Sequence, residues 1–122
     1  LVDCMPKNAT LYSFQVFDDI DFDNDRVIPL RDKIKSWDDT LNYIDQMDLI
    51  VSSCTSLPHA ASAMGKETIV LVPILNYYTW AYKHSKHSAW YSKSTTIIRQ
   101  KEHDNWNEPL SQLKDLLNVK NI

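Results

Sequence analysis

The chain has 122 residues, enough for one compact domain, and its 43% of apolar residues argue against disorder. The net charge is −3 with acidic and basic residues spread along the chain, which excludes the basic surface expected of a nucleic-acid-binding domain. A single glycine, Gly65, excludes the glycine-rich phosphate loops of dinucleotide-binding and P-loop proteins, and no apolar run approaches the roughly 18–20 residues that span a bilayer.

The first elements along the chain are two predicted strands separated by an acidic loop. Residues 11–17 (LYSFQVF) alternate and are rich in aromatic and aliphatic side chains, which predicts a strand. Residues 18–25 are acidic and predict a solvated loop. Residues 26–30 predict a short strand, which Pro29 places at an edge or at a strand end.

A helix is predicted to follow, with Asp38 or Asp39 as its N-cap and its end near Met47. Its apolar residues step by three along the chain and predict one buried stripe, made of Leu41, Ile44 and Met47. Residues 49–51 are uninterruptedly apolar and predict a short strand that is buried on both faces.

A turn, a helix and a strand come next. Residues 53–56 predict a polar turn, and residues 57–64 predict a helix with Ser56 as a candidate N-cap. Gly65 is expected to end this helix as the residue just past its last turn. Residues 68–72 (TIVLV) predict a second buried strand.

The remaining elements complete an alternating pattern. Residues 76–91 are rich in aromatic side chains without a clean period and predict a long loop with helical turns. Residues 95–99 predict a last strand, and residues 106–117 a closing amphipathic helix with Pro109 in its first turn. The alternation predicts an α/β fold, a Rossmann-like three-layer domain with a mostly parallel sheet that spans residues 1–122.

The two cysteines indicate a reducing environment. Cys4 and Cys54 lie far apart in the chain, and we expect two unpaired thiols in a cytoplasmic protein. The sequence has no pair of CxxC motifs and hence no signature of structural zinc. The chain begins at Leu1 rather than with Met, and we expect it to be part of a longer protein.

The turn after Val51 is the strongest candidate site, because ligands of open parallel sheets bind beyond the carboxyl ends of the strands. Its sequence, SSCTSLPH, places four hydroxyls and one thiol where a helix begins. The first amides of that helix carry partial positive charge, and the hydroxyls of Thr55 and Ser56 would add donors to an anion there. His59 follows one turn into the helix. This pattern predicts a diphosphate site; ordinary helix capping, with His59 on the surface, explains the same residues.

Residues 48–66, DLIVSSCTSLPHAASAMGK, resemble the signature of bacterial glycosyltransferases of the heptosyltransferase type. They are even more similar to relatives of those enzymes that are fused to tetratricopeptide repeats. The family pattern runs roughly D-L-V-I-S-x-D-T-x-x-x-H-x-A-x-A-L-G-K-P. It is matched in register at Asp48, Leu49, Thr55, His59, Ala61, Ala63, Gly65 and Lys66.

Three further segments resemble the same family in the same order. LYSFQ at residues 11–15 resembles the strand that opens the second domain of these enzymes. TWAYKHSKHSAWY at residues 79–91 resembles the D-W-R-W…S-P-W-Y-P segment. Residues 98–100 and 104–106 resemble the closing L-F-R-Q…G-D-W. The resemblance therefore extends over about residues 11–117.

The resemblance implies the C-terminal half of a GT-B glycosyltransferase, in which two Rossmann-like halves enclose the active site. That half holds the nucleotide-sugar donor, typically without a metal, and its partners are the N-terminal half and, in the fused relatives, tetratricopeptide repeats. By position in the motifs, Thr55 and Ser56 would contact the donor phosphates and His59 would support the diphosphate leaving group. Gln15 would point into the cleft, and Tyr77 and Trp80 would flank the nucleotide.

The sequence departs from the family pattern at Cys54, which stands where the family has Asp. A thiol holds sugar hydroxyls less well than a carboxylate does. The alternative is therefore a non-catalytic nucleotide-binding or scaffold domain. A reactive thiol at the helix N-terminus is a further reading, although no base partner is identifiable. In either case, this chain alone is expected to bind donor without turnover, because one half cannot supply both walls of a cleft.

None of three other patterns predicts a calcium, transition-metal or phosphoacceptor site. Residues 21, 23 and 25 are aspartates with the spacing of a calcium loop, but Arg26 stands where such a loop needs glycine, so a solvated loop is expected. The four histidines are expected to be exposed rather than metal ligands. A phosphoacceptor receiver domain would need an aspartate at the end of the strand that here ends in Ser53 and Cys54.

Overall fold

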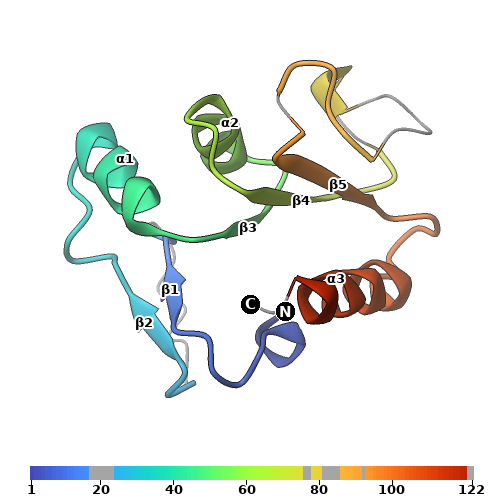
Figure 1. The fold of residues 1–122 in the computed structure, drawn as a ribbon, viewed down its shortest axis with the longest axis horizontal. Helices are drawn as coiled ribbons and strands as arrows, with labels where there is room; N and C mark the ends of the chain where they lie inside the picture. The colour runs from blue at the N-terminus through green and yellow to red at the C-terminus, as the bar shows by residue number, and fades with distance from the viewer. Residues whose placement is uncertain (17–23, 76–77, 81–85, 92, 121–122) are drawn as a thin grey trace.

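The structure is a computed structural model, and it describes residues 1–16, 24–75, 78–80, 86–91 and 93–120 (Figure 1). Strands and helices alternate along the chain, as the sequence predicts. The elements are η1 (Val2–Cys4), β1 (Leu11–Ser13), β2 (Val27–Pro29), α1 (Trp37–Gln46), β3 (Ile50–Ser53), α2 (Ser56–Ala63), β4 (Thr68–Val72), η2 (Tyr78–Trp80), β5 (Thr95–Arg99) and α3 (Asn107–Val119).

All strand pairs among the described residues that form ladders are parallel, which confirms the α/β class. β1 pairs with β2, with Tyr12 opposite Ile28. β3, β4 and β5 form a second sheet in that order. The two sheets are not hydrogen-bonded to each other, so the sheet that the sequence predicts as one is divided between β1 and β3.

The three layers are visible in Figure 1, where α1 and α2 lie on one face of the β3–β5 sheet and α3 lies on the other. β4 is buried along its whole length, and its side chains alternate between the two faces. Ile69 and Leu71 pack with Leu113 and Leu117 of α3. The intervening residues, Val70 and Val72, pack on the opposite face with Trp80 and Ile97.

The helix α1 begins earlier than the sequence analysis predicts. Its N-cap is Ser36 rather than Asp38 or Asp39. The Ser36 hydroxyl accepts from the Asp39 amide (3.2 Å), and the Asp39 carboxylate accepts from the amides of Ser36 (3.1 Å) and Lys35 (2.9 Å). This capping box satisfies amides on both sides of the helix start, which a single aspartate cap at 38 or 39 would not do.

The ends of α2 and α3 agree closely with the prediction. α2 begins one residue early, with Thr55 rather than Ser56 as N-cap. Gly65 follows its last turn with φ of +74°, a conformation that glycine adopts without strain. Pro109 lies in the first turn of α3, as expected. β1 is shorter than predicted, at three residues, and Phe17 lies outside the described residues.

Candidate functional site

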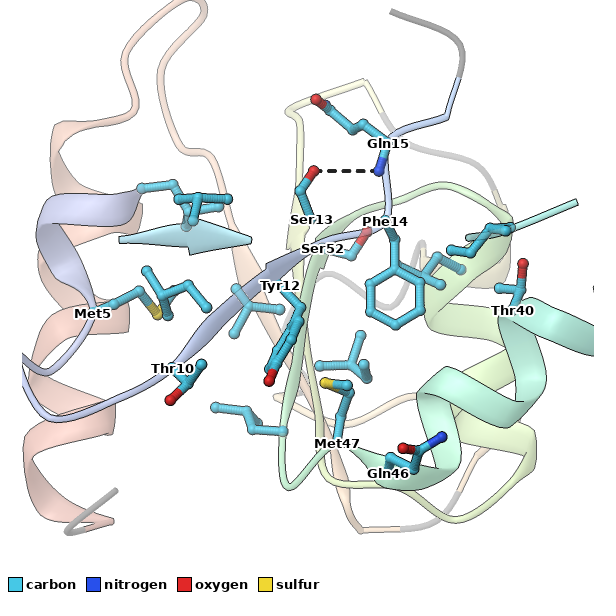
Figure 2. A pocket seen from close by; sticks show the side chains of 18 of the residues that line it. Met5, Thr10, Tyr12, Ser13, Phe14, Gln15, Thr40, Gln46, Met47 and Ser52 are labelled. Carbon is cyan, nitrogen blue, oxygen red and sulfur yellow. Dashed lines mark hydrogen bonds between the residues drawn. The ribbon is translucent and has the colours of Figure 1, made fainter. Parts of the chain in front are cut away.

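A groove separates the two sheets (Figure 2). One wall is formed by residues 10–16, which include β1, and the other by residues 48–53, which include β3, together with the start of α2. The first turn of α1 also lines it. Because α1 carries the chain from β2 back past β1 to β3, the strand order reverses between β1 and β3. Ligands of open α/β sheets bind at the carboxyl ends of the strands where the order reverses.

Phe14 fixes the position of the β1 segment against the rest of the domain. Its side chain packs against the buried cluster formed by Ile44, Ile50 and Ala61. Figure 2 shows the ring extending from the end of β1 toward α1, near Met47. This contact holds the carboxyl end of β1 opposite β3 although no strand ladder joins the two.

Hydroxyl groups gather at the carboxyl end of β3. Ser52, Ser53, Thr55 and Ser56 all line the groove. The Ser52 and Thr55 hydroxyl oxygens lie 3.5 Å apart, and the Thr55 amide donates to the Ser53 carbonyl (2.8 Å). Thr55 is the N-cap of α2, yet its side chain makes no capping hydrogen bond. The turn therefore presents hydroxyls and helix amides together, an arrangement that suits an anion.

Gln15 lies on the opposite wall of this groove. Its backbone amide donates to the Ser13 hydroxyl (3.3 Å), which shapes the turn out of β1. Figure 2 shows its exposed side chain extending away from Phe14. Gln15, Thr55 and Ser56, three of the residues that sequence analysis singled out, thus line one groove.

His59 lies elsewhere, in a cluster of aromatic rings. Its ring centroid is 4.7 Å from that of Trp80 and 5.6 Å from that of Tyr91, and its Nδ1 is hydrogen-bonded to the Tyr91 hydroxyl. Burial lowers the pKa of His59, because removal from water disfavours the imidazolium ion. Burial likewise raises the pKa of Tyr91. His59 is not among the side chains that line the groove.

Cys54 and Trp80 belong to that second region as well. Trp80 is buried, with 1% of its surface exposed. Cys54 is half-buried and packs against the cluster of Val70, Val72, Trp80 and Ile97. The turn after β3 thus directs Cys54 toward the core, whereas its neighbours Ser53 and Thr55 are exposed and line the groove. Tyr77 lies outside the described residues.

Several residues that line the groove were not singled out from the sequence. They include Ser13, Arg31, Lys35 and Trp37. Trp37 is 55% exposed. The signal that could have found it is the Ser36-to-Asp39 spacing, which is that of a capping box and places the start of a helix at Trp37.

The described residues offer no group of three or more His, Cys, Asp or Glu side chains that could hold a metal ion. Asp21 and Asp23 of the calcium-like spacing lie outside the described residues. Both cysteines are free thiols, as expected. Within the described part of the chain, no helix has the length and hydropathy needed to cross a membrane.

No family model matches the chain, and comparisons with curated proteins and with solved structures give no match either. The resemblance to glycosyltransferases therefore rests on the four sequence motifs, and it stays a prediction.

Proposed function

We propose that this chain is the donor-binding half of a GT-B glycosyltransferase that resembles the heptosyltransferases and their relatives fused to tetratricopeptide repeats. The diphosphate of a nucleotide sugar lies at the start of α2, in the groove between β1 and β3. The observation that carries the proposal is the hydroxyl-rich turn at residues 52–56, which lines that groove where the strand order reverses.

The residues of the turn suit a diphosphate bound without a metal. Hydroxyls of Thr55 and Ser56 donate to phosphate oxygens, and the first amides of α2 add their partial positive charge. Thr55 is exposed and its side chain makes no capping hydrogen bond, so an anion would compete only with the 3.5 Å contact between the Thr55 and Ser52 hydroxyls. Gln15 on the facing wall reaches the sugar or the ribose from the end of β1.

His59 takes a different part in this proposal from the one that the motif implies. Its Nδ1 is occupied by Tyr91 and its ring lies against Trp80. It therefore supports the site indirectly, by holding the segment around Tyr91 against α2. Cys54, packed toward the core, would not contact the sugar.

The experiment is a calorimetric titration of the 122-residue chain with a panel of nucleoside diphosphates and their sugars. Binding of one nucleotide is expected, with affinity lost in the double variant Thr55→Ala/Ser56→Ala. Ser111→Ala is the matched control, because Ser111 is an exposed serine on α3 that does not line the groove. Equal affinity in the double variant and the parent would refute the proposed site.

The alternative is a nucleotide-binding or scaffold domain without catalysis, and Cys54 in place of the family's aspartate favours it. A longer protein that includes the proposed N-terminal half distinguishes the enzyme from this alternative. Transfer of sugar to an acceptor supports the enzyme, whereas binding of the nucleotide sugar without transfer or hydrolysis supports the alternative. Absence of any binding at millimolar ligand supports a scaffold.

A further inference from the structure

The apolar stripe of α1 continues beyond the core. Trp37, Leu41 and Ile44 are spaced four and three residues apart, so they lie on one face of the helix. Ile44 is fully buried and Leu41 packs against its cluster. Trp37 does not belong to that cluster and leaves 55% of its surface exposed. The stripe therefore runs out of the core at its N-terminal end, where Trp37 lines the groove.

The position of Trp37 is fixed by the helix start. It is the first residue of α1, directly after the N-cap Ser36 and inside the capping box closed by Asp39. An exposed tryptophan that is held at a defined place costs little conformational entropy when a ligand covers it, because its backbone is already ordered.

The neighbours of Trp37 in the groove suit an anionic ligand with a flat ring. Arg31 and Lys35 precede α1 and line the same groove, as does Thr40 one turn further on. Asp32 also lines the groove, so the positive charge is confined to the part of the groove near Arg31 and Lys35. α1 and α2 pack against each other, and both begin beside the carboxyl end of the sheet, since each leads the chain back to the start of a parallel strand. The indole and the hydroxyl turn both line this groove.

We propose that Trp37 is the surface on which the base of a nucleoside diphosphate stacks, with the diphosphate at the start of α2. This inference rests on the proposed function, and it names a residue and an interaction that the motifs do not contain. The stack is tolerant of base identity, because every base has a π face. Arg31 and Lys35 add electrostatic attraction for the phosphates.

The test compares nucleoside diphosphates with inorganic pyrophosphate, which has no base. In Trp37→Ala, affinity for every nucleoside diphosphate that binds the parent is expected to fall roughly 5- to 150-fold, while affinity for pyrophosphate is unchanged. Trp37→Phe retains a ring and is expected to lose less. Trp90→Ala is the matched control, since Trp90 is 61% exposed and does not line the groove.

The outcomes separate this inference from the proposed function. If nucleotides bind and Trp37→Ala leaves their affinity unchanged, the stacking role is wrong and the function stands. If Trp37→Ala weakens nucleotides and pyrophosphate equally, Trp37 shapes the groove rather than stacking on a base, and the inference is again wrong. If neither ligand binds the parent chain, both the proposed function and the inference fail. Circular dichroism of each variant shows whether the fold is retained.

Discussion

The imidazole Nδ1 of His59 and the hydroxyl of Tyr91 are hydrogen-bonded across a separation of 32 residues. The bond joins α2 to the segment before β5, in which His87 forms an isolated antiparallel bridge with Thr96. The Trp80 ring lies against the same imidazole, so two aromatic side chains that follow β4 both contact one residue of α2. His59 thus holds Trp80 and Tyr91 against α2, in the region that the motif analysis expected to flank a nucleotide.

Removing the Tyr91 hydroxyl should therefore weaken the fold. Tyr91→Phe keeps the ring against Trp80 and His59 but leaves the His59 nitrogen without its partner. A loss of about 0.5–1.5 kcal/mol in the free energy of unfolding is expected, the usual range for one internal hydrogen bond. Urea denaturation followed by circular dichroism measures it. Tyr12→Phe, at an exposed tyrosine of β1, is the control and should change stability far less.

The same histidine should make stability depend on pH. Burial lowers the pKa of His59 from its ordinary value of 6.5, so the folded state favours the neutral ring. As pH falls below about 6.5, the unfolded chain takes up a proton that the folded chain resists, and the free energy of unfolding declines until the lowered pKa is passed. Above that range both states are neutral and His59 contributes no pH dependence.

Denaturation of the parent and of His59→Gln at a series of pH values measures this effect. Glutamine does not titrate, so the decline as pH falls below about 6.5 should be smaller in the variant. Parallel curves for the two proteins over that range would show that the pH dependence comes from other groups.

The capping box of α1 predicts a cost for losing its hydroxyl. Ser36→Ala removes the acceptor of the Asp39 amide, and a loss of about 1 kcal/mol is expected. Ser36→Asn retains a capping oxygen and should lose much less. The midpoint of urea denaturation gives both values. A destabilisation of similar size in Ser36→Ala and Ser36→Asn would mean that capping is not the cause.

The sequence predicts most of the fold because its strongest signals are local. Strand β4 and strand β5 have the predicted bounds, since TIVLV and TTIIR are short apolar segments with few other ways to be buried. The division between β1 and β3 has no local signal, because it depends on how two strands far apart in the sequence approach each other. The N-cap of α1 was misplaced because three acidic or hydroxyl residues compete within four positions, and only the reciprocal Ser36–Asp39 bonds decide among them.

The candidate site was predictable only where its residues are set by their position at a strand end. Thr55 and Ser56 follow a strand end, where parallel sheets place ligands, so position alone indicated them. Their neighbours Cys54 and His59 are close in sequence but face the core and the aromatic cluster. Which way each residue of a turn points depends on the turn's backbone, and residue order does not reveal it. Trp37 was missed because the helix was predicted to begin after Asp38 or Asp39, so the apolar stripe of Leu41 and Ile44 was not extended back to it.

Gly65 offers a test of backbone conformation that is independent of packing. Its φ is +74°, and a Cβ placed there would meet no heavy atom within 4 Å. Gly65→Ala should therefore destabilise the chain by about 1–2 kcal/mol through left-handed strain alone, because no clash is created. Gly65→Asn should cost less than alanine, since asparagine tolerates this conformation better. Thermal and urea denaturation of both variants give the ranking. An alanine variant as stable as the parent would show that the helix can end with residue 65 in another conformation.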